Sequence, residues 1–186
     1  MREATFESKG AIRFSDAEIA VVKRAAALAE ELVSEHYKMS ESQWLRGRYD
    51  IRTAQDLDVA ELVDGPFAQV IRYEGRRRKG ALNSEAFDFY QICLQDHAIL
   101  SLVRHQKPMD LLAFVLYVIT HELIHIVRFS MFLQSYEASE TERLDEEARV
   151  HRITRTILEP VRLEGLSAVF EHYRLWEEPF EKLERH

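Results

Sequence analysis

Two histidines and a glutamate within five residues form the pattern in this chain that could do chemistry. They are His121, Glu122 and His125, in the run HELIH. On an α-helix, residues four positions apart lie one above the other, so both imidazoles can share one metal ion. Glu122 is turned by about 100° from His121 on such a helix. Its carboxylate therefore lies beside the metal, where it could take a proton from metal-bound water.

The setting of this motif favours a metal site over a chance arrangement. Residues 109–134 are the most apolar stretch, with an uninterrupted run from Leu111 to Ile119 before the motif and Arg128 after it. A membrane span needs ~20 predominantly apolar residues, which this run does not reach without charges. The pattern instead predicts a central core helix that is polar at one spot. Unsatisfied imidazole and carboxylate groups would cost free energy there, and a metal removes that cost.

The segment Val118–His125 (VITHELIH) resembles the active-site helix of zincin metallopeptidases. In the gluzincin branch of that family, the third metal ligand is a glutamate on the following helix. The resemblance is at the level of the motif and covers roughly residues 114–158. It implies that His121, His125 and Glu147 hold a zinc ion, since Glu147 lies 22 residues after His125 in the run DEEA.

Two adjacent glutamates compete for the role of third ligand. On a helical projection, Glu146 and Glu147 flank the middle of the apolar arc on opposite sides, so position alone does not decide between them. Glu147 shares a stripe with His151, and gluzincins commonly place a small residue, here Ala148, directly after the ligand. We therefore predict Glu147, while Glu146 and a pair of solvated surface acids remain as alternatives.

His151 is where the chain departs from the gluzincin pattern, which often has an aspartate four residues after the ligand glutamate. It could orient a ligand or donate a hydrogen bond to a developing negative charge. It could be a fourth ligand, which would close the site, because catalytic zinc keeps one position open for water. It could also be an ordinary core histidine. We predict the first role and count Glu122 and His151 as the catalytic residues.

The predicted function is zinc-dependent hydrolysis of peptide bonds, with a peptide or protein as substrate and Glu122 as general base. The alternative is a metal-binding module without peptidase activity, acting as a sensor, scaffold or redox centre, in which His151 completes a four-ligand site. Two imidazoles and a carboxylate also suit iron, manganese and nickel. A carboxylate-bridged diiron bundle is disfavoured, because no second glutamate in the chain has a histidine three residues later.

The elements that position the motif point to a mostly helical α+β fold. Periodicity and capping signals predict helices from Ser15 to about Lys38, between Thr53 and Gly65, over 109–134, from Ser139 to before Pro160, and over 166–176. Residues 40–52 are predicted to be a polar loop. Phe67–Tyr73 and Phe87–Leu94 are rich in β-formers.

These segments predict one domain over residues 1–186, with a small antiparallel sheet packed on the HExxH helix. The basic run at residues 76–79 is expected to be a solvated hairpin tip. The resemblance to zincins further implies an edge strand that binds extended peptide through main-chain hydrogen bonds. We assign that role to Phe87–Leu94.

Composition excludes several classes of function. The chain has 186 residues, 46% hydrophobic and 31% charged, which is typical of a globular protein. Acidic residues outnumber basic ones 32 to 25, giving a net charge of −7, which argues against nucleic acid as a partner. The single cysteine, Cys93, and a charged first ten residues without an apolar run predict a cytoplasmic protein with no signal peptide and no membrane partner. Oligomeric state stays open.

Several further residues are weaker candidates for a site. Packing or surface roles are expected for His97 and His105, an inert buried thiol for Cys93, and a possible donor role at an oxyanion for Tyr136, His172 and Tyr173.

Overall fold

The computed structural model describes residues 12–40, 49–76, 86–105, 109–131, 133 and 138–177. The chain divides into two compact units. The sheet unit comprises Met1–Ser15 and Met39–Leu100, and the helical unit comprises Asp16–Lys38 and Ser101–His186. Within the described ranges there are five α-helices and one three-stranded sheet, which confirms the predicted, mostly helical α+β class. Whether residues 1–186 form one domain stays a prediction.

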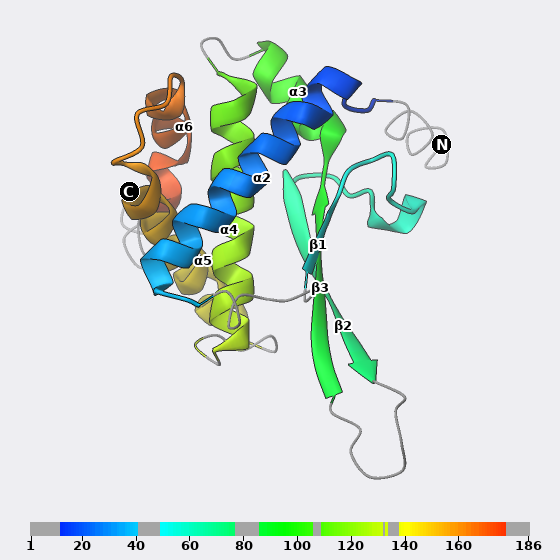
Figure 1. Ribbon diagram of the computed structural model, residues 1–186, viewed down its shortest axis with the longest axis vertical. Coiled ribbons are helices and arrows are strands. Elements are labelled where there is room, and N and C mark those ends of the chain that lie inside the picture. Colours follow the sequence, from blue (N-terminus) through cyan, green and yellow to red (C-terminus); the bar gives the residue numbers. More distant parts are fainter. Residues whose placement is uncertain are drawn as a thin grey trace. The chain divides into compact units, whose positions relative to one another are not determined.

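The sheet unit is built around two long antiparallel strands. Strand β2 (Ala68–Arg76) pairs antiparallel with β3 (Ala86–Leu94), as predicted (Figure 1). A short third strand, β1 (Tyr49–Arg52), pairs parallel with β3, so the strand order is β1-β3-β2 and the sheet is mixed.

Two predictions about this sheet are wrong. Residues 49–52 form a strand rather than part of a polar loop. The strand was not predicted because its sequence, YDIR, lacks a run of β-formers and its pairing partner lies some forty residues later in the chain. As a consequence, Phe87–Leu94 lies within the central strand and not at an edge. Residues 90–93 are paired with β1 on one side and with β2 on the other, so this part of the strand cannot also receive a peptide by β-augmentation.

Polar side chains directly after β3 anchor the loops of the sheet unit. The Asp96 carboxylate is fully buried and accepts hydrogen bonds from the backbone N–H of Phe14 at 2.9 Å and of Ala54 at 3.0 Å. Asp96 also begins helix α3 (Asp96–His105), which the sequence analysis did not predict. His105 is therefore the last residue of a helix. The short helix predicted after Thr53 is a single 3₁₀ turn, Val59–Glu61.

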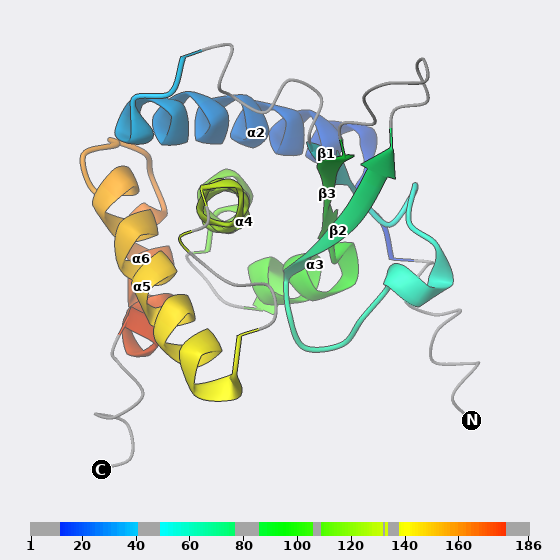
Figure 2. The same ribbon diagram turned by 90° about the horizontal axis from the view of Figure 1, so that it is seen from below.

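Besides the last residues of α3, the described part of the helical unit contains four helices and a final 3₁₀ turn. They are α2 (Asp16–Tyr37), α4 (Leu111–Ser130), α5 (Glu140–Leu158), α6 (Leu166–Tyr173) and η2 (Arg174–Glu177). Figure 2 shows α4 end-on, with α2 along one side and α5 and α6 along another. The bounds agree with the predicted helices, and Ser139 caps α5 in a capping box with Glu142.

Helix α4 is the core of this unit. By length and composition it could cross a membrane, but 83% of its apolar window is buried inside the protein. This is the burial of a core helix in a soluble protein, as the polar interruption at the motif predicted. Asp110 caps its start by accepting from the backbone N–H of Ala113 at 3.0 Å.

A close approach at the entry to α6 gives a first testable prediction. Gly165 has φ +89°, and a Cβ added there would lie 2.7 Å from the Cβ of Asp110. Gly65 has φ +103° with no atom within 4 Å of such a Cβ. Backbone strain of this type costs ~1–3 kcal/mol. Gly165→Ala is therefore expected to lower the free energy of unfolding by more than Gly65→Ala, as measured by urea denaturation; equal losses would contradict the clash.

Candidate metal centre

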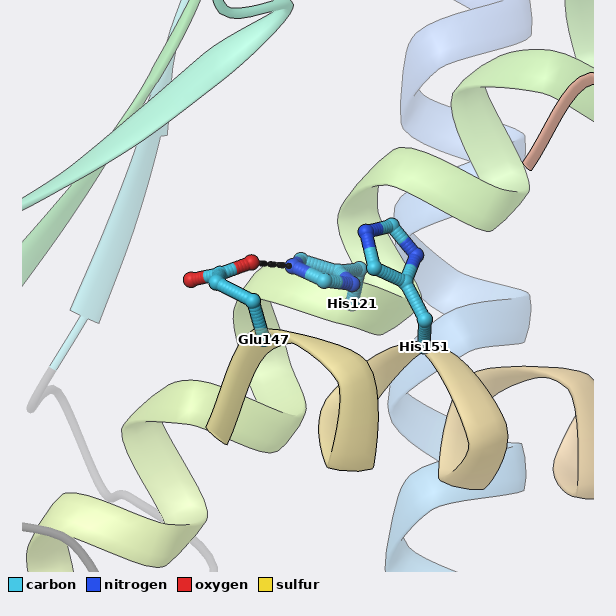
Figure 3. Close-up of side chains that lie close together, drawn as sticks. All are labelled: His121, Glu147 and His151. Carbon is cyan, nitrogen blue, oxygen red and sulfur yellow. Dashed lines mark hydrogen bonds and ion pairs between the residues drawn. The ribbon is translucent and has the colours of Figure 1, made fainter. Parts of the chain in front are cut away.

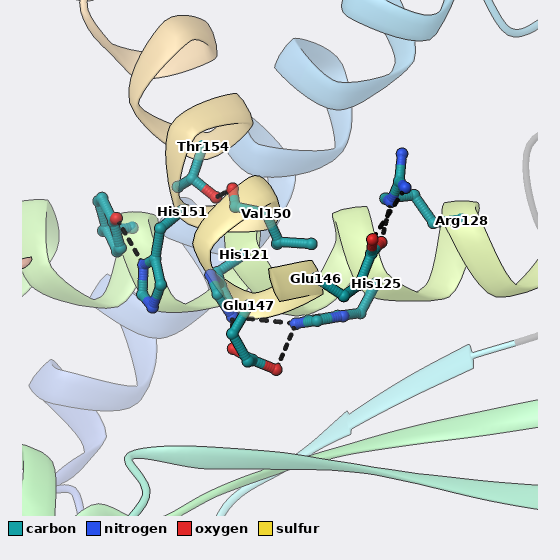
Figure 4. A network of polar contacts seen from close by, with 9 residues as sticks. His121, His125, Arg128, Glu146, Glu147, Val150, His151 and Thr154 are labelled. Atoms are coloured by element: carbon teal, nitrogen blue, oxygen red, sulfur yellow. Dashed lines mark hydrogen bonds and ion pairs between the residues drawn. The ribbon is translucent and has the colours of Figure 1, made fainter. Parts of the chain in front are cut away.

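Helices α4 and α5 face each other through a ladder of polar side chains (Figure 4). Residues later in α4 meet residues earlier in α5, so the two helices run antiparallel along this face. In order along α4, the contacts join Tyr117 to His151, His121 and His125 to Glu147, and Arg128 to Glu146. The middle of the ladder is the predicted metal site.

The structure brings His121, His125 and Glu147 into mutual contact. The Nε2 atoms of the two histidines lie 3.1 Å apart. One Glu147 oxygen, Oε2, lies 3.2 Å from Nε2 of His121, and the other, Oε1, lies 3.1 Å from Nε2 of His125. Zinc bonds of about 2.0–2.1 Å in a tetrahedral site separate ligand atoms by about 3.3–3.4 Å. The three contacts are close to this spacing, with a different oxygen of Glu147 facing each histidine.

Burial and charge suit these groups to a cation. His121 and His125 are 8% and 6% exposed, whereas the Glu147 side chain is 43% exposed and forms the open side of the cluster. Although burial raises the pKa of Glu147, its bonds to the two histidines outweigh that effect and hold the pKa well below its ordinary range. The carboxylate is therefore ionised, as a metal ligand must be. Nδ1 of His121 is buried without a hydrogen-bond partner among the described residues, so contacts at Nε2 hold this ring.

The competition between the two glutamates has a structural answer. Glu146 is buried and receives two hydrogen bonds from the guanidinium of Arg128, one from Nε and one from Nη2 at 3.1 Å. Arg149 adds a contact of 3.5 Å to Oε2. Of the two acids, Glu147 alone contacts the histidines. Arg128 is the residue in the sequence that could have decided between Glu146 and Glu147, because a charged side chain within an apolar helix needs a buried partner.

Glu122 lies on the same helix with its carboxylate free for a reacting group. It is partly exposed, and no side chain or backbone group of the described residues hydrogen-bonds to it. Burial raises its pKa, while His121 and His125 act in the opposite direction. A raised carboxyl pKa is what a general base working near neutral pH requires.

His151 lies next to the three clustered side chains. Its Nδ1 is hydrogen-bonded to the hydroxyl of Tyr117 at 2.9 Å, and its ring centroid lies 4.3 Å from that of His121. One ligand atom each from His121, Glu147 and His151 fall within 4.8 Å of one another (Figure 3). Burial lowers the pKa of His151 to about 3, and the charge of His121 adds to the effect, so the imidazole is neutral.

Aromatic side chains from α6 and η2 pack around the ring of His151. The rings of Tyr173 and Tyr117 stack with their centroids 4.4 Å apart. The centroid of the His151 ring lies 5.0 Å from that of Tyr173 and 6.0 Å from that of Trp176. Burial and the charge of Glu122 both raise the pKa of Tyr173, so its hydroxyl is within the electrostatic reach of Glu122.

Tyr117 and Trp176 were not among the predicted site residues. Tyr117 carries a usable signal, since it lies four residues before His121 and hence on the same helix face. Trp176 carries none, because its place depends on how α6 packs.

Tyr173 packs against His151, but the other weaker candidates that the structure describes do not join the cluster. His97 and His105 lie on α3, and the His172 ring packs edge-on against Phe114 at 6.1 Å. Cys93 is a fully buried free thiol whose pKa is raised by burial, in agreement with the prediction of an inert side chain. Tyr136 and residues 77–79 of the basic run lie outside the described residues.

A scan against protein-family models and searches of curated proteins and of solved structures give no match to this chain. The chemistry of the centre therefore rests on the geometry of its own residues.

Proposed function

We propose that this protein is a zinc-dependent metallopeptidase whose metal is held by His121, His125 and Glu147. One observation carries the proposal: on two helices, Nε2 of His121 and Nε2 of His125 lie 3.1 Å apart, and each lies 3.1–3.2 Å from a different oxygen of Glu147, while the adjacent Glu122 carboxylate has no hydrogen-bond partner among the described residues. Two imidazoles and one carboxylate are the donor set of catalytic zinc sites that keep a fourth position open. This is also the ligand set that the resemblance to gluzincins implies.

Each remaining side chain has a defined task in this proposal. Zinc at this position would supply a water whose pKa is lowered to about 7 and would polarise the carbonyl to be cleaved. Glu122 takes the proton from the attacking water and passes it to the leaving amine. His151 donates a hydrogen bond to the carbonyl oxygen as negative charge develops on it. The substrate is a peptide or protein, and the proposed location is the cytoplasm, where a lone buried thiol such as Cys93 stays reduced.

A closed metal-binding module is the second candidate, and one observation favours it. A nitrogen of His151 lies within 4.8 Å of ligand atoms of both His121 and Glu147, so a modest shift would make it a fourth ligand. With four protein ligands the site would be structural or sensory rather than hydrolytic. Iron, manganese or nickel would suit the same donors.

The two candidates differ in whether the zinc-loaded protein cleaves peptides. We expect incubation with a mixture of peptides of diverse sequence to generate new termini, detected by mass spectrometry. A zinc chelator should abolish them and added zinc should restore them. A protein that holds stoichiometric zinc, cleaves nothing and does not bind a hydroxamate would contradict the peptidase and support the closed module.

A further inference from the structure

A buried hydrogen bond joins the two helices at one end of the ladder. Tyr117 is fully buried on α4, one turn before His121, and its hydroxyl lies 2.9 Å from Nδ1 of His151. The His151 ring is also held against the rings of His121 and Tyr173. With Nδ1 occupied in this way, Nε2 is the nitrogen of His151 left for the cluster (Figure 3).

The direction of this bond determines what His151 can do. A neutral imidazole carries one N–H and one lone pair, on different nitrogens. If the Tyr117 hydroxyl donates to Nδ1, then Nε2 carries the proton and is a hydrogen-bond donor that cannot bind a metal. If Nδ1–H donates to the hydroxyl, then Nε2 has the lone pair and can become the fourth ligand. The tautomer therefore separates the catalytic reading of His151 from the closed site.

The chemistry of the two groups favours donation by Tyr117. A phenol, with an ordinary pKa of about 10, is a far stronger acid than a neutral imidazole N–H, and an imidazole nitrogen, with a conjugate-acid pKa of about 6.5, is a far stronger base than a phenol oxygen. The contacts within the cluster also favour three ligands without His151, because His121, His125 and Glu147 contact one another at 3.1–3.2 Å. In the described part of the chain His151 forms no ion pair with Glu147, although ligand atoms of the two residues lie within 4.8 Å of each other.

We propose that Tyr117 is a positioning residue that holds His151 in the Nε2–H tautomer, so that His151 donates a hydrogen bond into the site and the fourth metal position stays open. The role of the donated bond rests on the proposed function, whereas the tautomer does not. Removing the hydroxyl frees Nδ1 to carry the proton. The lone pair then moves to Nε2, which faces the metal position.

The tautomer can be read in the metal-free protein by nitrogen-15 NMR of the imidazole side chains. The expected result is an unprotonated Nδ1 and a protonated Nε2 for His151, assigned by loss of the signals in His151→Gln. Tyr117→Phe should shift His151 toward the opposite tautomer. Tyr173→Phe is the matched control, because it removes a hydroxyl from the same aromatic cluster without touching this bond, and it should change nothing. A protonated Nδ1 in the unsubstituted protein would overturn the proposal.

Cobalt(II) binding tests the consequence for the metal. In the cobalt-loaded protein, His151→Gln should leave the visible absorption bands unchanged, because His151 is not a ligand. Tyr117→Phe should alter those bands and tighten cobalt binding, because Nε2 of His151 then adds a fourth ligand. Bands that change in His151→Gln would overturn the proposal and identify a closed site. A protein that binds no cobalt would contradict the proposed function, while the NMR result would still decide the tautomer.

Discussion

Glu122→Gln is expected to keep the metal and lose peptidase turnover. Glutamine has nearly the same shape as glutamate but cannot take a proton, so the attacking water is no longer activated. General acid–base catalysis of this kind contributes about 10²–10⁴-fold to a rate, which sets the expected loss in kcat. Glu122 has no hydrogen-bond partner among the described residues, so its substitution should disturb the fold little.

The measurement is the rate of cleavage of the best peptide together with the metal content of each protein. Glu164→Gln is the control, because Glu164 is exposed and lies outside the cluster. Turnover should be unaffected in the control and metal content unaffected in both variants. A Glu122→Gln protein that holds metal and cleaves at the original rate would remove Glu122 from the chemistry.

Arg128→Met is expected to give the largest loss of stability among the substitutions considered. Arg128 and Glu146 form a buried ion pair, and removing Arg128 leaves the buried carboxylate with only the longer contact to the exposed Arg149 at 3.5 Å. Such a change costs about 3–5 kcal/mol, whereas replacing both members by apolar residues is often neutral or stabilising.

The matched comparison is therefore Arg128→Met alone against Arg128→Met combined with Glu146→Leu. Urea denaturation followed by circular dichroism should show a large drop in the free energy of unfolding for the single variant. The double variant should recover most of that loss. If the double variant is as unstable as the single one, packing of the Arg128 stem rather than the stranded charge is responsible.

The parts of the fold that follow from local sequence were predictable. The bounds of α5 are set by the Ser139 capping box, and α4 by its apolar run. The alignment of His121 with His125 needs only the helical repeat. These features depend on neighbours within a few residues, which a single sequence displays.

What escaped prediction depends on residues far apart in the chain. Strand β1 is stabilised by pairing with β3, so its own sequence does not mark it, and without β1 the central place of β3 could not be inferred. The choice between Glu146 and Glu147 is made by Arg128 on another helix. The hydrogen bond from Tyr117 to His151 likewise exists only once α4 and α5 pack together.

The metal content of the protein tests the central claim most directly. Mass spectrometry of protein purified without added metal is to be compared with His121→Ala and with His36→Ala, which removes an exposed histidine on α2. A site with these donors predicts about one equivalent of zinc in the unsubstituted protein and in His36→Ala, and almost none in His121→Ala. Absence of metal from all three, or zinc retained in His121→Ala, would contradict a metal centre at His121, His125 and Glu147.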